Sequence, residues 1–197
     1  MEAEVIKQIL LDADVVIHFI KGEQIELLPS IFENDKIILK NVLEELSGKK
    51  YADGMEVLKK SSKVKLIDFK ADLKIMKEYA SLLKYFGKGE SACMAFCKFN
   101  ENILASSNLR DISKYCKENG IEYITTMDFL AEALRAGQLS EIECNQFIIS
   151  VKSKDSKLPV STIKEYLCET RFTVRSVISN DQLSEFLVCY RNEHKQN

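Results

Sequence analysis

The stretch QILLDADVVIHF, residues 8–19, ends an apolar run with two carboxylates and then continues as a second apolar run. We expect the first run to be a buried strand that ends at Asp12, and Asp14 to cap a helix beginning at Val15. In open α/β sheets, ligands bind in the crevice at the carboxyl ends of the strands. Asp12 is therefore the first candidate functional residue.

Further short apolar runs alternate with segments of helical periodicity along the chain. The expected strands are residues 36–39 (KIIL), 64–69 (VKLIDF, an edge strand), 103–105 (ILA) and 123–125. Such alternation predicts an α/β protein with a mainly parallel central sheet that is flanked by helices on both faces.

Several of the predicted helices are amphipathic. We expect one over residues 24–32, with a break at Pro29, and a longer one over residues 71–86 whose apolar face lies on the sheet. Beyond Pro159 the pattern changes, and helices are expected at residues 161–168, 172–178 and 181–192. The chain is therefore predicted to comprise a domain over residues 1–152 and a C-terminal helical extension over residues 153–197.

The composition is that of an ordinary globular protein, with 46% hydrophobic and 29% charged residues among 197. A net charge of −2 argues against a strongly basic protein that coats nucleic acid, and the lysines of residues 49–65 are interpreted as a solvated face. No apolar run approaches the roughly 20 residues of a membrane helix, and the first residues are acidic. We therefore expect a cytoplasmic protein that does not bind membranes.

Six cysteines lie in apolar segments without any CxxC pair, and the chain has only two histidines. We interpret the cysteines as reduced core residues rather than zinc ligands. His18 falls within the apolar run after Asp12, so a buried structural role is expected for it rather than a role as catalytic base.

Four polar residues are expected at strand ends or helix starts, where a parallel sheet brings them together: Asp12, Glu45, Glu90 and Asn108. Gathered carboxylates repel one another unless a cation neutralises them, and oxygen ligands of this kind suit Mg²⁺ or Mn²⁺. Such a site can activate water and stabilise the leaving oxygen of a phosphodiester.

These segments resemble the motifs of the PIN-domain family, which includes the VapC-type ribonuclease toxins. LLDADVVIHFI resembles the opening LLDTNVLIDL, VLEEL resembles the second acidic motif, and GKGESACMAF resembles GxGEAEAIALA. The segment ILASSNLRDISKYCKENGIEYITTMDFL resembles the strand, acidic turn, helix and strand that follow. The resemblance covers about residues 6–151 and implies a three-layer PIN-like fold.

The resemblance implies that Asp12, Glu45 and Glu90 are catalytic, metal-binding acids, with Glu44 a close rival of Glu45. Asn108 stands where the family usually has Asp; its carbonyl oxygen can coordinate a metal but adds no negative charge. Asp111 and Asp128 are the candidates to supply that charge.

Each of these residues also has a structural interpretation. Asn108 and Asp111 have the spacing of a helix cap and its reciprocal partner. Glu90 and Asp128 are expected in the first turns of helices, where acids are favourable to the helix dipole. Glu45 by itself could be a surface acid of a helix.

The favoured function is an Mg²⁺- or Mn²⁺-dependent endoribonuclease that hydrolyses RNA, with a toxin-type role, an antitoxin-like protein partner and a homodimer as finer hypotheses. One alternative is a degenerate PIN module that binds RNA or a protein without cutting. Another is a haloacid dehalogenase-type phosphatase, because LLDADVV resembles its DxDx[TV] strand, although no later acidic strand end is present. The lack of GxxxxGK[ST] and GxGxxG sequences argues against a nucleotide-binding enzyme.

Overall fold

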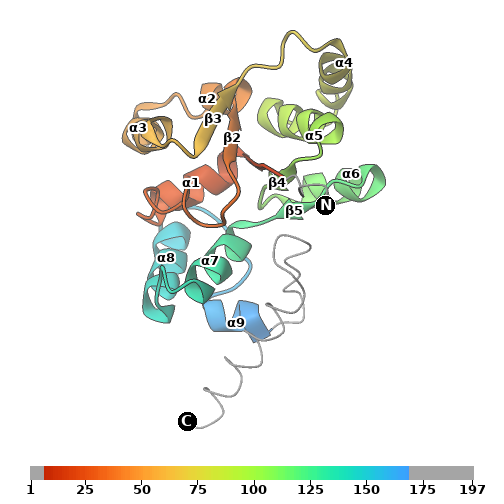
Figure 1. Cartoon of the computed structure of the whole chain (residues 1–197). Coiled ribbons are helices and arrows are strands. Elements are labelled where there is room, and N and C mark those ends of the chain that lie inside the picture. The colour runs from red at the N-terminus through yellow and green to blue at the C-terminus, as the bar shows by residue number, and fades with distance from the viewer. Residues whose placement is uncertain (1–6, 169–197) are drawn as a thin grey trace, which may run out of the picture.

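Five short parallel strands form the central sheet of the computed structural model, which describes residues 7–168 (Figure 1). The strand order is β3-β2-β1-β4-β5, so β1 occupies the middle and β3 and β5 are the edges. The strands are β1 (Ile9–Leu11), β2 (Lys36–Leu39), β3 (Val64–Ile67), β4 (Ile103–Ala105) and β5 (Tyr123–Ile124). All four neighbouring pairs are parallel, so the carboxyl ends of the strands meet at one edge.

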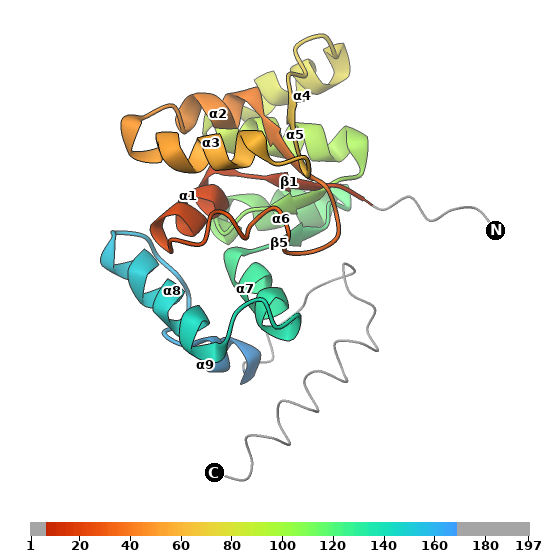
Figure 2. The ribbon, with the colours of Figure 1, turned by 60° about the vertical axis from the view of Figure 1, so that its left-hand side comes forward.

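Helices cover both faces of this sheet. The first are α1 (Ala13–Lys21), α2 (Lys40–Glu45), a 3₁₀ turn at Lys49–Tyr51, α3 (Ala52–Lys60), α4 (Leu73–Leu82) and α5 (Lys88–Asn100). They are followed by α6 (Leu109–Asn119), α7 (Thr126–Arg135), α8 (Glu141–Ser153) and α9 (Ile163–Cys168). Helix α5 packs across β1, β2 and β4 with α4 and α6 beside it, and α1 packs on α8. Figure 2 shows α7, α8 and α9 grouped below β5.

The predicted α/β architecture is confirmed, because the apolar runs are buried as strands. All residues of β1, β2 and β4 are buried, as expected for parallel strands covered on both faces. The edge strand β3 exposes Leu66 by 47%, which fits its polar sequence. Within residues 7–168, no helix is long and apolar enough to cross a membrane.

The helix predicted over residues 24–32 is wrong. This segment forms successive turns, in which the N–H of Leu27 donates to the carbonyl of Gln24 and the N–H of Ser30 to that of Leu27. Positive φ angles at Glu23 and Phe32 bound it, and a helix cannot continue through such residues. The apolar spacing instead reflects buried side chains within a loop, among them Leu28 and Ile31.

Helix α4 is shorter than predicted, and its apolar side packs mainly on α5 rather than on the sheet. Asp72 caps it by accepting hydrogen bonds from the backbone N–H groups of Lys74 and Ile75. Its apolar residues are unequally covered, because Leu73 is 83% exposed whereas Ile75 and Leu82 are buried. The periodicity correctly predicts a helix, but it does not predict which of the apolar residues are buried.

The C-terminal part of the described chain packs against the body of the fold. Helix α9 confirms the helix predicted at residues 161–168 and lies on α7 and α8. The helices predicted at residues 172–178 and 181–192 lie outside the described residues. The division at residue 152 stays a prediction.

Four cysteines are buried as predicted: Cys93, Cys97, Cys116 and Cys144. Cys168, at the end of α9, is exposed, and Cys189 lies outside the described residues. Burial raises the pKa of the Cys93 and Cys97 thiols, which favours the protonated, unreactive form.

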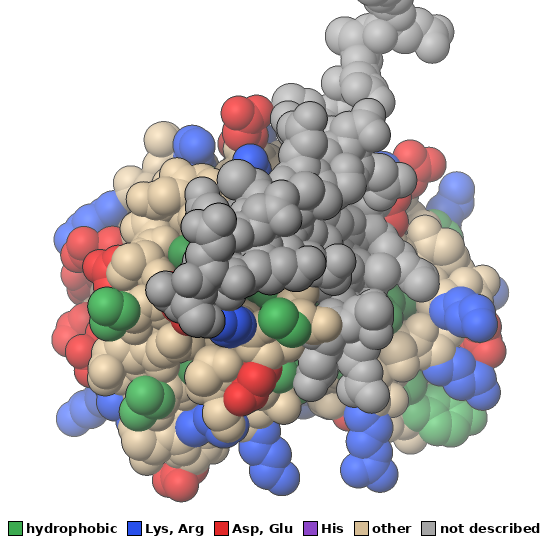
Figure 3. Space-filling view, turned by 90° about the horizontal axis from the view of Figure 1, so that it is seen from below, with side chains coloured by type: hydrophobic (Ala, Val, Ile, Leu, Met, Phe, Trp, Pro, Cys, Tyr) green, Lys and Arg blue, Asp and Glu red, His purple; other side chains and the backbone are tan. Residues whose placement is uncertain are grey.

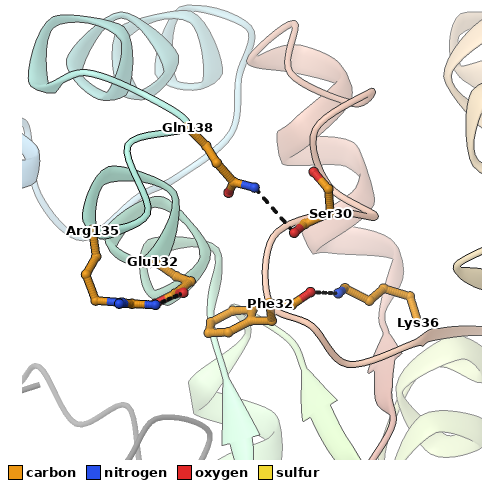
Figure 4. A network of polar contacts seen from close by, with 6 residues as sticks. All are labelled: Ser30, Phe32, Lys36, Glu132, Arg135 and Gln138. Carbon is orange, nitrogen blue, oxygen red and sulfur yellow. Dashed lines mark hydrogen bonds and ion pairs between the residues drawn. The ribbon is translucent and has the colours of Figure 1, made fainter. Parts of the chain in front are cut away.

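A buried lysine fixes the loop that enters β2 (Figure 4). Lys36 has no exposed surface, and its ammonium donates hydrogen bonds to the carbonyls of Phe32 at 2.9 Å and Asn34 at 2.6 Å. The ring of Phe32 packs edge-on against Phe129 of α7. Burial and the nearby charge of Lys63 lower the pKa of Lys36 to about 7.

This pKa predicts a pH dependence of stability. The folded state holds the Lys36 proton less tightly than the unfolded chain, so the free energy of unfolding should rise with pH from about 7 upward. Between pH 7 and 8 we expect the wild type to gain about 1 kcal/mol more than Lys36→Met does. Urea unfolding at both pH values measures the difference.

The matched control is Lys59→Met, which removes an exposed lysine of α3 and should change stability with pH as the wild type does. Equal pH slopes for the wild type and Lys36→Met would contradict a lowered pKa at Lys36, whatever the absolute stability of the variant.

Candidate metal centre

Asp12 lies between β1 and α1, at the carboxyl edge of the sheet. Its backbone N–H donates to the carbonyl of Ala105 at 2.9 Å, which ties the end of β1 to the end of β4. Its Oδ1 accepts a hydrogen bond from the N–H of Ala13 at 2.8 Å, and the thiol of Cys93 lies 3.9 Å from the same oxygen. The residue is only 3% exposed, so this carboxylate is held in a fixed place.

Two further acids surround Asp12 closely enough to change its ionisation. Burial, together with the negative charges of Asp14 and Glu90, raises the pKa of Asp12 to about 8. Burial also raises the pKa of Asp14 to about 6, against the opposing effect of hydrogen bonds from backbone N–H groups. Carboxylates that repel one another in this way are stabilised in their ionised form by a cation.

The prediction that Asp14 caps a helix starting at Val15 is wrong, because Asp12 is the N-cap and α1 begins at Ala13. Asp14 turns instead toward the end of β4, where its Oδ2 accepts a hydrogen bond from the N–H of Ser107 at 2.7 Å. A shift of the helix start by two residues thus brings a second carboxylate beside Asp12. The DxD spacing was visible in the sequence, but only the phosphatase interpretation gave Asp14 a site role.

Glu45, rather than its neighbour Glu44, reaches toward the start of α5. Its Oε1 accepts a hydrogen bond from the backbone N–H of Gly89 at 2.7 Å. A Cβ atom on Gly89 would lie 2.6 Å from the Glu45 Oε2, so the glycine is what allows this close approach. The carboxylate of Glu45 therefore lies at the first turn of α5.

Asn108 joins two acids of the site through its side-chain amide. The amide nitrogen donates to Glu90 Oε1 and, at 2.8 Å, to Asp111 Oδ2. Asn108 is the N-cap residue of α6 by position, but its side chain does not cap the helix. The interpretation of Asn108 and Asp111 as a reciprocal helix cap is therefore wrong, because the two side chains bond to each other and the Asn108 side chain does not cap the helix.

Asp128 has a complete set of structural partners. Its Oδ2 accepts from the N–H and the hydroxyl of Thr125, both at 2.7 Å, in a capping box that begins α7. Its Oδ1 accepts from the hydroxyl of Tyr166 at 2.9 Å. No hydrogen bond within residues 7–168 joins it to Asp12, Glu90 or Asn108.

His18 is buried, as predicted, and burial lowers its pKa to about 4. Its Nδ1 lies 2.8 Å from the hydroxyl of Thr126, which in turn lies 2.8 Å from the hydroxyl of Ser107. This buried chain of polar groups steadies Ser107, whose N–H holds Asp14. No local sequence pattern indicates it, because its members are up to 108 positions apart.

The donor set suits a hard divalent cation. Carboxylate oxygens of Asp12, Asp14 and Glu90 and the amide of Asn108 offer oxygen ligands, and burial together with the nearby charge of Asp14 raises the pKa of Asp12. As the side chains stand, no group of three or more His, Cys, Asp or Glu residues in the described part of the chain is arranged to hold an ion. Binding would therefore require rearrangement, which includes releasing Glu90 from the Asn108 amide.

A family model described as a PIN domain matches residues 8–170, which is most of the chain. The protein therefore belongs to the PIN-domain family. The match extends past residue 152 and includes α9. No curated protein matches the sequence.

The solved structures that are similar to the chain include two VapBC complexes. DNA-bound VapBC from Salmonella typhimurium has 16% identity and a TM-score of 0.46, and the match covers 61% of this chain and 98% of that one. VapBC2 from Rickettsia felis, bound to a DNA fragment from their promoter, has 18% identity and a TM-score of 0.44, with coverage of 59% and 97%.

Asp12→Asn should raise the melting temperature of the metal-free protein at pH 7, because burial holds the Asp12 carboxyl protonated there, at a cost in stability that an uncharged amide does not carry. We expect roughly 2–4 °C for each kcal/mol relieved. The same variant should lose the increase in melting temperature that Mn²⁺ gives the wild type. Thermal unfolding in EDTA and in Mn²⁺ measures both effects.

Glu44→Gln is the matched control, since Glu44 is exposed and lies beside Glu45 on the same helix. It should respond to Mn²⁺ as the wild type does. A similar Mn²⁺ response in Asp12→Asn would show that ions bind elsewhere.

Proposed function

We propose that this protein is an Mg²⁺- or Mn²⁺-dependent endoribonuclease. The observation that carries the proposal is the gathering of Asp12, Asp14 and Glu90 at the carboxyl edge of the parallel sheet, where burial, together with the charges of the other two acids, raises the pKa of Asp12. Membership of the PIN-domain family supports the same chemistry, whereas nothing in it favours a haloacid dehalogenase-type phosphatase.

The position of each acid suggests a different role in the reaction. Asp12, Asp14 and Glu90 would hold the ion, with Asn108 contributing its carbonyl oxygen once its amide leaves Glu90. Glu45, fixed by Gly89, would stand at the margin and accept a proton from the attacking water. When bound, a divalent cation lowers the pKa of a water molecule and offsets the charge that develops on the phosphate oxygens.

Packing would keep these groups in place during the reaction. Ser107 holds Asp14 through its backbone N–H, and Ala13 holds Asp12 in the same way. Because these donors belong to the backbone at the ends of buried strands, Asp12 and Asp14 would need little reorganisation, whereas Glu90 would first have to leave the Asn108 amide.

Cleavage of a labelled single-stranded RNA tests the proposal. We expect the wild type to cut it with Mn²⁺ or Mg²⁺ but not in EDTA, and Asp12→Asn to lose at least about 100-fold in rate, as expected when transition-state charge stabilisation is removed. Glu44→Gln should cut as the wild type does. Cleavage by Asp12→Asn at the wild-type rate would refute the site.

A second candidate is a PIN module that binds RNA or a protein without cutting it, and Asn108 is the observation that favours it. Its side-chain amide donates hydrogen bonds to Glu90 and Asp111, so it partly compensates the negative charge that a bound cation would otherwise neutralise. This candidate predicts RNA binding by the wild type without cleavage in any divalent metal. A toxin-type role with an antitoxin-like partner, or a homodimer, is a finer proposal that depends on the nuclease.

Asn108→Asp separates the two candidates. The substitution removes the amide donor and adds a negative charge beside Glu90, so it should lower the melting temperature in EDTA and strengthen Mn²⁺ binding. We expect RNA cleavage at saturating Mn²⁺ to rise several-fold if the wild type is a weak nuclease, or to appear if it only binds.

Asp111→Asn is the control, because it changes the other partner of the Asn108 amide without adding charge. Metal affinity that is equal in Asn108→Asp and the wild type would contradict the assignment of this position to the metal centre.

A further inference from the structure

A groove of about 460 Å³ lies directly beside the acid cluster, and the proposed metal site does not use it. It runs between the start of α6, the end of β5, the start of α7 and the segment before α9. Asn108, whose amide bonds Glu90, forms part of its wall, as does Ser107, which holds Asp14. A molecule in the groove would therefore touch the residues that position the acids.

The groove has an apolar floor and an aromatic wall. Met127 and Leu158 line it and are almost fully buried, and the half-buried ring of Tyr123 lies beside them. Its volume is within the range of ligand-sized pockets and is sufficient for one nucleobase with its sugar. Flat apolar surfaces with an aromatic ring are what unstacked bases bind.

Two cations stand at the rim of the groove. Arg110 and Lys157 line it and are exposed, and neither takes part in an ion pair among residues 7–168. The acid in the wall, Asp128, is already engaged by Thr125 and Tyr166. Figure 3 shows the molecule from below, with Lys and Arg side chains around the margin of that face.

We propose that this groove binds a nucleobase of single-stranded RNA, with the adjoining phosphate on Arg110 and Lys157. The inference rests on the proposed nuclease function and deepens it. The base would stack on Tyr123 over the floor formed by Met127 and Leu158, and the next phosphate along the strand would lie at the acid cluster. Every base can stack on an aromatic ring, so the groove would add affinity and fix the position of the RNA strand without a strict sequence preference.

The test measures binding without cleavage. A fluorescein-labelled 12-nucleotide single-stranded RNA is titrated with the full-length protein in EDTA, and fluorescence anisotropy gives the dissociation constant. We expect Tyr123→Leu to bind about tenfold more weakly, the usual effect of losing one base–aromatic contact. Tyr123→Phe, which keeps the ring, should bind as the wild type does.

A second experiment tests the role of the two cations by comparing two double variants that each lose two positive charges. Arg110→Gln with Lys157→Gln should weaken binding and reduce the slope of log affinity against log salt by about 1.4, as expected for two lost phosphate contacts. Lys114→Gln with Lys117→Gln removes two exposed lysines of α6 that do not line the groove, and it should change affinity less than twofold.

Several outcomes would overturn the inference. Wild-type protein that fails to bind the RNA, or equal weakening by both double variants, would exclude a specific subsite. Unchanged binding by Tyr123→Leu would show that the groove serves another occupant, such as a protein side chain. Because binding is measured without metal, RNA that binds through the groove but is never cut with Mn²⁺ would refute the nuclease and leave the groove intact.

Discussion

The structure depends on the hydrogen bond between the N–H of Asp12 and the carbonyl of Ala105. It joins the ends of the two central strands and, in doing so, buries a carboxylate at the start of α1. Burying an acid is costly unless donors or a cation compensate it. The N–H of Ala13 does so in part, and the acids that lie nearby increase the remaining cost. A bound cation would offset part of that cost.

The neighbouring elements are arranged around this carboxylate. Helix α5 passes over β1 with Cys93 against Asp12, and its glycine start leaves room for Glu45. The chain of polar contacts from His18 through Thr126 to Ser107 positions the backbone N–H of Ser107, which donates a hydrogen bond to Asp14. Stability and site geometry are therefore coupled, because the same backbone groups that end the strands also orient the acids.

Much of the fold could be predicted because its three central strands are short, mostly apolar and fully buried. Residues 36–39 and 103–105 are continuous runs of the kind that parallel strands form when both faces of a sheet are covered. The loop at residues 24–32 could not be predicted, since buried Leu28 and Ile31 mimic a helical stripe. The packing of α4 on α5 could not be predicted either, because periodicity indicates that one face of a helix is buried but not which element covers it.

The candidate site residues could be named from the sequence, but their contacts could not. Asp12, Glu45, Glu90 and Asn108 are predicted from their places after strands and at helix starts, and their role as metal ligands stays a prediction. Asp14 was missed because the start of α1 decides which acid faces inward, and a shift of two residues exchanges their roles. The groove near Tyr123 is formed by segments far apart in the chain, so no local pattern reveals it.

The most direct test of the metal centre is a crystal structure determined with Mn²⁺, in which anomalous scattering locates the ion. The account predicts one strong peak in contact with Asp12, Asp14 and Glu90, with the carbonyl oxygen of Asn108 turned toward it. A peak at Asp128, or at the acids of the opposite edge of the sheet such as Asp35, with none at Asp12, would contradict it.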